Sequence, residues 1–186
     1  SAADNDSLKL SGAQMIFIAG QCSLLTMTMS IDQKMMTRAL QLAAKAIEHD
    51  EVPVGAVVYR GNTVLAEAHN TRESSSDPTA HAEILALREA AKRTGSWRLD
   101  GCSLAVTLEP CPMCAGALIN ARVEKLVYGA TDPKMGCVHT LYELVSDTRF
   151  NHRVQITAGV HADQCSQLLR DFFGKLRSKD RTISNG

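Results

Sequence analysis

The sequence predicts an α/β fold, a three-layer α/β/α sandwich built on a five-stranded mixed sheet. Two observations predict this fold. Segments rich in Val and Ile alternate along the chain with segments whose apolar residues recur at helical spacing. The chain of 186 residues is also long enough for one domain with a buried core and short for two. We therefore expect helices on both faces of a single sheet.

The first elements are a helix and a hairpin. Ser30 and Gln33 have the spacing of a capping box, and the apolar residues that follow keep a helical period until Ile47. Residues 54–59 and 63–69 are predicted strands, and the Gly61 turn between them joins them into a hairpin.

The second half of the chain is predicted to alternate between helices and strands. Pro78 is expected to open a helix that Gly95 ends, because Pro suits the first helical position and Gly the position after the last. The remaining elements are predicted as a strand, a helix, a strand, a short helix, a strand and a last helix, over residues 103–108, 112–121, 125–130, 141–145, 154–160 and 162–176.

Three regions are predicted from composition. Residues 1–30 start polar, become apolar and end in a Thr/Met run, and Lys9 is their one basic residue, whereas a secretory signal needs a basic start. We predict an N-terminal extension over residues 1–30, one globular domain over residues 31–178 and a basic C-terminal tail over residues 179–186.

Overall composition excludes some classes of function. Twenty basic and twenty acidic residues give a net charge of zero, which disfavours non-specific binding of nucleic acid through bulk charge. The six cysteines are scattered through a chain of ordinary core-forming composition, so no disulfide scaffold is needed and a reduced, cytoplasmic setting is predicted. The apolar runs are too short to cross a membrane, so no membrane partner is expected.

Two predicted helix starts carry residues that bind metals. One contains His81 and Glu83, and the other contains Cys111 and Cys114 around Pro112. Free N–H groups and the dipole at a helix start favour thiolates, which are good zinc ligands. Three protein ligands with an open fourth position are typical of a catalytic zinc, whose bound water is then acidic enough to react. Glu83 is placed to act on that water as a general acid/base.

Each of these residues has a plainer interpretation when taken alone. A single histidine is more often a core residue, a single C-x-x-C can be redox-active, and a carboxylate is common in a first helical turn. H-x-E followed by P-C-x-x-C is much more specific, being a signature of zinc nucleobase deaminases. A closed structural zinc site would need a fourth ligand from His69, Cys102, Cys137, His139 or His161.

The chain resembles the bacterial tRNA adenosine deaminases over residues 31–177, on the segments VPVGAVV, DPTAHAEILALREA, TLEPCPMCAGAL, VYGATDPKMG, FNHRVQITAGV and ADQCSQLLRDFF. The resemblance implies a cytidine-deaminase-like fold and conversion of the wobble adenosine of a tRNA anticodon to inosine by a zinc-bound hydroxide. It also implies a homodimer. A zinc deaminase of a free base or nucleoside, such as guanine or cytidine, remains the alternative. A non-catalytic zinc protein is disfavoured because Glu83 is present.

The resemblance also implies roles for individual residues. His81, Cys111 and Cys114 would hold one zinc ion per subunit, and Glu83 would carry protons between the water and the base. Asn70 would face the flipped base, Val54, Gly55 and Ala56 would form the pocket wall, and Asp132 would meet the ribose-phosphate before the target. Asp132 is equally well interpreted as a turn residue ahead of Pro133. Residues 136–140, GCVHT, depart from the family pattern.

Overall fold

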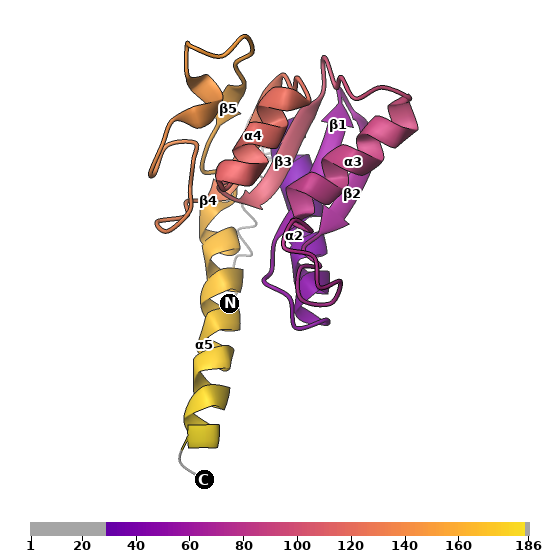
Figure 1. Ribbon diagram of the computed structural model, residues 1–186. Coiled ribbons are helices and arrows are strands. Elements are labelled where there is room, and N and C mark those ends of the chain that lie inside the picture. The colour runs from indigo at the N-terminus through magenta and orange to yellow at the C-terminus, as the bar shows by residue number, and fades with distance from the viewer. Residues whose placement is uncertain (1–28, 185–186) are drawn as a thin grey trace, which may run out of the picture.

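The computed structural model describes residues 29–184, so almost all of the predicted extension over residues 1–30 lies outside the described residues. Helices and strands alternate within that range as expected (Figure 1). The elements are α2 (Ile31–Ile47), β1 (Gly55–Arg60), β2 (Thr63–His69), α3 (Ala82–Thr94), β3 (Ser103–Leu108), α4 (Pro112–Asn120), β4 (Lys125–Ala130), the 3₁₀ turn η1 (Leu144–Ser146), β5 (Gln155–Thr157) and α5 (Ala162–Ser184).

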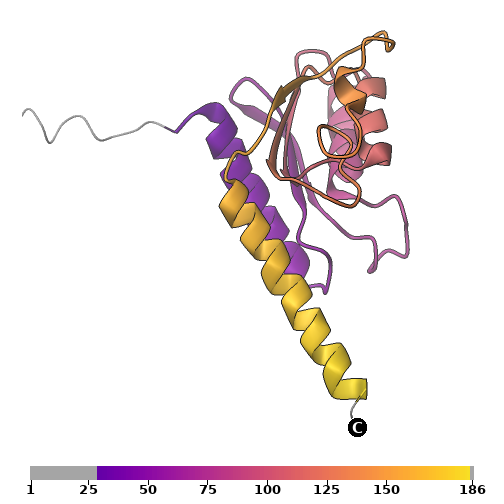
Figure 2. The same cartoon turned by 90° about the vertical axis from the view of Figure 1, so that its left-hand side faces the viewer.

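The strands form one mixed sheet in the order β2-β1-β3-β4-β5. Strand β1 is antiparallel to β2 and to β3, whereas β3, β4 and β5 run parallel to one another. Helices α3 and α4 cover one face, and α2 and α5 lie side by side on the other (Figures 1 and 2). The predicted three-layer sandwich on a five-stranded mixed sheet is thereby confirmed.

Successive side chains of the central strands pack on opposite faces of the sheet and so form two cores. Val58 belongs to the core that also contains residues of α3 and α4, whereas its neighbour Val57 packs with residues of α2 and α5. Successive side chains of a strand point to opposite faces, so a strand that is apolar at every position suits a sheet covered on both sides.

Helix α2 and strand β1 show how local sequence sets the packing. Ser30 and Gln33 form the predicted capping box, in which each side chain accepts a hydrogen bond from the other residue's backbone. A Cβ atom at Gly55 would meet the Ala39 carbonyl oxygen and lie 2.6 Å from the Ala43 nitrogen. Gly55 therefore allows α2 to lie directly against the sheet.

Helix α3 begins four residues later than predicted, at Ala82 and not at Pro78. The Asp77 side chain accepts a hydrogen bond from the Thr79 N–H at 2.8 Å, and the Asp77 carbonyl accepts one from the Ala80 N–H at 3.1 Å. Pro78 therefore stands in a turn, a setting that suits its fixed φ as well as a first helical turn does.

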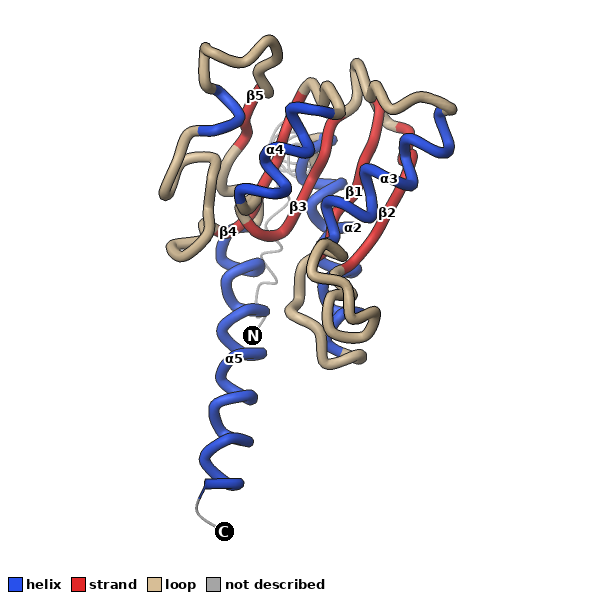
Figure 3. The backbone as a smooth tube through the Cα atoms, in the orientation of Figure 1, coloured by secondary structure: helices blue, strands red, loops and turns tan. Residues whose placement is uncertain are grey.

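Three further predictions of element length were wrong. The helix expected over 141–145 is only the short η1, so the connection between β4 and β5 is mostly irregular (Figure 3). Strand β5 is limited to Gln155–Thr157, the three residues that pair with β4. Helix α5 continues beyond residue 176 to Ser184, because no Pro or other helix-terminating residue interrupts its charged end. No helix in residues 29–184 is long and apolar enough to span a membrane.

Candidate active site

Helices α3 and α4 begin next to each other with side chains that face one another. His81 is the N-cap residue of α3, with φ −73° and ψ 147°, and Cys111 is the N-cap residue of α4, with φ −72° and ψ 174°. Neither side chain caps its own helix, so both are available to a ligand. Pro112 occupies the first turn of α4 as predicted, and Cys114 follows one turn after Cys111.

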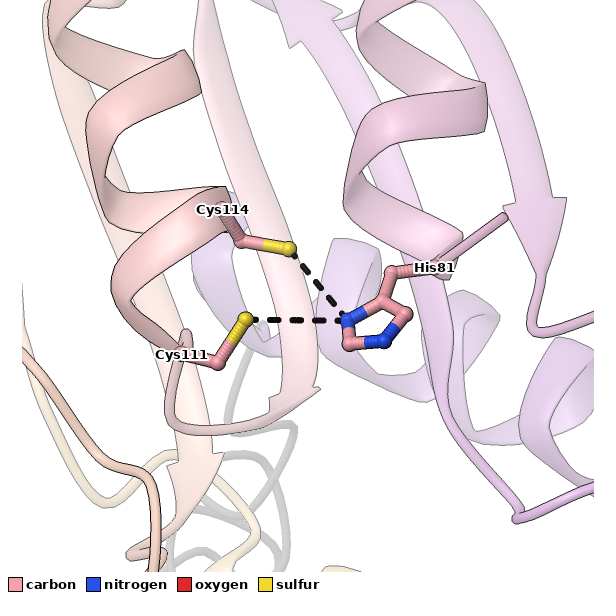
Figure 4. Close-up of side chains that lie close together, drawn as sticks. All are labelled: His81, Cys111 and Cys114. Atoms are coloured by element: carbon pink, nitrogen blue, oxygen red, sulfur yellow. Dashed lines mark hydrogen bonds between the residues drawn. The ribbon is translucent and has the colours of Figure 1, made fainter. Parts of the chain in front are cut away.

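The three predicted ligands come together in the geometry that a metal ion needs. The His81 Nδ1 atom lies 3.7 Å from Cys111 Sγ and 3.6 Å from Cys114 Sγ (Figure 4). Among the side chains described, those of residues 29–179, this is the one group of three His, Cys, Asp or Glu residues whose ligand atoms all lie within 4.8 Å of one another. Tetrahedral zinc bonds place nitrogen and sulfur ligands about 3.5 Å apart, so the site fits zinc.

The thiols of Cys111 and Cys114 shift each other's pKa. The Cys111 sulfur accepts hydrogen bonds from the Cys114 thiol and from the His81 ring, and these bonds lower the pKa of Cys111 to about 4 although burial opposes its ionisation. The same bond with Cys111 and burial raise the pKa of Cys114. Zinc binds thiolates, so a metal ion held here would require both sulfur atoms to be deprotonated.

Glu83 lies in the first turn of α3 and is only 4% exposed. It is not a member of the three-ligand group. Burial raises the pKa of Glu83, which is the shift expected of a carboxyl group that holds a proton part of the time.

His81, Glu83 and Cys111 line one cavity of about 490 Å³, and Cys114 is buried behind them. Of the predicted pocket wall, Val54 lines the cavity, whereas Gly55 faces α2 and Ala56 lies in the core. Asp132 lines the cavity too, and its Oδ1 atom accepts hydrogen bonds from the N–H groups of Lys134 and Met135, as a turn residue does. The full lining is Val52, Val54, Asn70, Arg72, Pro78, His81, Glu83, Leu108, Glu109, Cys111, Pro112, Met113, Asp132 and Met135.

Asn70 is held at the cavity by a buried carboxylate that sequence reasoning missed. The Asn70 Nδ2 atom donates to Glu51 Oε2 at 3.0 Å, and Glu51 Oε1 accepts from the Ser74 N–H at 2.7 Å and hydroxyl at 2.8 Å. Burial opposes ionisation of Glu51, but the hydrogen bonds from Ser74 lower its pKa below the ordinary value. A carboxylate only accepts, so the Asn70 amide is fixed with its nitrogen toward Glu51.

Glu109 is the second buried carboxylate that sequence reasoning missed. It is 2% exposed and accepts hydrogen bonds from the N–H groups of Asp132, Val138, His139 and Thr140 and from the Thr140 hydroxyl. Burial opposes its ionisation, but these bonds lower the pKa of Glu109 to about 2. The signal that could have found both carboxylates is an acid adjoining a buried strand, where an unpaired charge would be costly.

The fold and the three-ligand site with its adjacent glutamate define a nucleobase deaminase of the cytidine-deaminase-like class. Residues 30–177 match the family model described as MafB19-like deaminase. The chain is 48% identical to the tRNA-specific adenosine deaminase of Bacillus subtilis strain 168, over 82% of this chain and 95% of that protein. It is 46% identical to the tRNA-specific adenosine deaminase of Haemophilus influenzae, over 81% and 87%.

The similar solved structures are deaminases as well. A structure from a study of A-to-I editing by tRNA:A34 deaminases is 40% identical, with a TM-score of 0.71 over 73% of this chain and 99% of that one. A guanine deaminase from Bacillus subtilis is also 40% identical, but with a TM-score of 0.52 over 53% and 64%. The chain therefore belongs to the MafB19-like deaminases and, within them, to the tRNA-specific adenosine deaminase family.

Proposed function

We propose that this protein deaminates the wobble adenosine of a tRNA anticodon, converting adenosine and water to inosine and ammonia. The observation that carries the reaction is one cavity lined by two members of the His/Cys/Cys donor set, by the buried Glu83 and by the fixed Asn70; the third donor, Cys114, lies 3.6 Å from the His81 ring nitrogen. The choice of tRNA rests on the named relatives, whose length the chain covers almost fully. A tRNA substrate also supports a cytoplasmic location.

A zinc ion, one per subunit, is the metal that the donor set fits, and His81, Cys111 and Cys114 would hold it. Bound there, zinc supplies the Lewis acidity that makes water a nucleophile at neutral pH. Glu83 accepts a proton from the attacking water and delivers protons to the ring nitrogen and to the departing ammonia. Burial raises the pKa of Glu83, so its carboxyl group accepts a proton more readily than an exposed glutamate does, as a proton carrier requires.

The remaining walls of the cavity suit a purine that has left its stack. Val54 and Leu108 supply apolar surface, and the fixed Asn70 amide supplies polar groups at a constant position. Unstacking is cheap in a single-stranded anticodon loop, so the energy needed to bring the base into the cavity is small.

The C-terminal helix offers a surface for the phosphates that flank the target. Lys175 and Arg177 are exposed on α5, Phe173 is 41% exposed and Phe172 is buried. Phe172 therefore anchors the helix, while Phe173 is free to stack on a base. If the basic residues contact phosphates, replacing both Lys175 and Arg177 by Ala weakens stem-loop binding and reduces its dependence on salt, with metal content unchanged.

We also propose a homodimer, formed through the outer face of α4. Ala115 is buried in the core, but a Cβ atom at Gly116 would meet nothing within 4 Å. The neighbouring Trp97 is 63% exposed and Phe150 is 42% exposed, and both adjoin Gly116 in a surface hollow. Light scattering at micromolar concentration is expected to give the mass of a dimer, and Gly116→Arg is expected to give a monomer.

The deciding experiment compares RNA with free compounds. A stem-loop of an arginine tRNA anticodon with a wobble adenosine is incubated with the protein, in parallel with free guanine, cytidine and adenosine. Inosine is expected in the stem-loop, with no turnover of the free compounds. Turnover of free guanine and none of the stem-loop would support the alternative, a deaminase of a free base, which the similarity to guanine deaminase favours.

A further inference from the structure

The buried Glu109 side chain accepts hydrogen bonds from a segment that lies far from it in the sequence. It lies between β3 and α4, and its carboxylate is the acceptor for five neutral donors. All five belong to residues 132–140 of the connection between β4 and β5. The His139 and Thr140 N–H groups lie 2.8 and 3.0 Å from Glu109 Oε1, and the Asp132 N–H lies 3.1 Å from Oε2.

The segment that Glu109 holds contains no regular secondary structure (Figure 3). Its other backbone bonds include Gly136 N–H to the Asp132 carbonyl at 2.9 Å and Cys137 N–H to the Pro110 carbonyl at 2.9 Å. A Cβ atom at Gly136 would come within 2.6 Å of the Asp132 carbonyl oxygen and closer still to the Glu109 carboxylate. The segment is therefore wrapped tightly around one side chain, and its shape depends on that side chain.

The same segment supplies two residues to the cavity, Asp132 and Met135. Glu109 is only two residues before Cys111, the first residue of the α4 start. One carboxylate thus connects a wall of the substrate cavity to the helix start that carries two of the three metal-binding side chains.

We infer that Glu109 is a positioning residue for substrate recognition, which holds residues 132–140 at the cavity against the start of α4. The inference rests on the proposed function only in naming RNA as the substrate that the segment meets. It also gives a role to Thr140, which belongs to the GCVHT stretch and whose hydroxyl and N–H both donate to Glu109.

The test uses Glu109→Gln, because glutamine has nearly the same shape but presents an NH₂ group where a second acceptor oxygen stood. Glu143→Gln is the matched control, an exposed glutamate in the same connection. In Glu109→Gln, we expect unchanged metal content and a saturating rate within about threefold of wild type. The stem-loop concentration for half-maximal rate should rise at least about tenfold, the effect of losing a hydrogen bond to a charged group.

A second readout follows the segment without using activity. Amide hydrogen exchange at Val138, His139 and Thr140 is expected to become at least about tenfold faster in Glu109→Gln. Glu143→Gln should leave exchange and half-saturation unchanged. Unaltered exchange and half-saturation in Glu109→Gln would overturn the inference, and so would loss of the metal together with the rate, since Glu109 would then act on the ligands.

Thr140→Val carries the test if Glu109→Gln does not fold, because it removes one donor and keeps the four N–H groups. Faster exchange and a smaller rise in half-saturation are expected, with Thr140→Ser close to wild type, and no change in Thr140→Val would count against the inference. If the wild type turns over free guanine and not the stem-loop, the proposed function has failed. The same variants are then compared with guanine, and the exchange result still decides the role of Glu109.

Discussion

The starts of α3 and α4 carry the same kind of N-cap residue, but the segments that lead into the two helices differ. Each places a proposed metal ligand at the N-cap, His81 in α3 and Cys111 in α4, and neither side chain caps its helix. Helix α4 follows β3 after three residues and has Pro in its first turn. Helix α3 follows β2 only after residues 70–81, which are held by distant contacts such as that of Ser74 with Glu51.

The two starts also differ in what they add to the ligands. The first turn of α4 contains Cys114 and no acidic residue, whereas the first turn of α3 contains Glu83. We therefore expect the α4 start to supply two of the three metal ligands, and the α3 start to supply the third ligand and the proton carrier.

The largest effect is expected from breaking the ligand set, to which both starts contribute. Cys111→Ala and His81→Ala should each lose the metal and reduce inosine formation to background, because three protein ligands hold a catalytic zinc. Metal analysis of the purified variants checks this. Cys102→Ala, which changes a buried thiol outside the cavity, is the control and should keep about one zinc per chain. Full metal content in either ligand variant would refute the assignment.

A smaller loss of activity is expected from Glu83→Gln, which tests whether Glu83 carries protons without holding the metal. The variant should keep its metal and lower the single-turnover rate by at least about a hundredfold, the typical contribution of a general acid/base. Loss of the metal in this variant would mean that Glu83 contributes to metal binding and not only to proton transfer. A rate close to that of the wild type would leave Glu83 as an ordinary first-turn carboxylate.

Glu51→Gln tests whether distant contacts set the route into α3. At neutral pH we expect the free energy of unfolding to fall by about 1–3 kcal/mol, as when hydrogen bonds to a charged group are lost. The Glu51 pKa is lowered in the folded protein, so its contribution is full above the ordinary value of 4.5 and is lost as the pH falls through the lowered pKa.

Denaturation of both proteins at pH 7 and pH 4 measures that difference, which should be smaller at the lower pH. Arg72 is the charged residue whose field also lowers the Glu51 pKa, and Asn70 and Ser74 are the uncharged partners. Glu73→Gln is the control, because Glu73 is exposed and pairs only at the surface with Arg72. A difference that does not change with pH would rule out ionisation of Glu51 as its source.

The smallest effect is expected from Pro112→Ala, which removes the local signal at the α4 start. The Ala115 N–H already donates to the Cys111 carbonyl at 2.8 Å, so the helix start should survive. We expect a loss of about 0.4–1 kcal/mol in the free energy of unfolding, since proline chiefly restricts the unfolded chain. Metal content and rate should be unchanged, and a lost metal would show that Pro112 does more than preset the backbone.

The elements whose causes lie within a few residues could be predicted from the sequence. The capping box of Ser30 and Gln33 and the proline in the first turn of α4 are local, and both predictions are confirmed. The five strands were found because apolar runs bounded by turn residues are local patterns as well. That His81, Cys111 and Cys114 lie together could be predicted because His, Cys and Glu at these spacings have few other uses together.

Features whose causes lie far apart in the chain could not be predicted from the sequence and are seen only in the folded protein. Pro78 has the same local signal as Pro112, yet it stands in a turn, and α3 begins only at Ala82. Glu51 and its hydrogen-bond donor Ser74 are 23 residues apart in the sequence, and Glu109 and its donor Thr140 are 31 apart. The residues next to either glutamate therefore do not indicate which groups it will bind. A buried carboxylate must find its donors wherever the fold brings them, which is why these contacts emerged only with the folded chain.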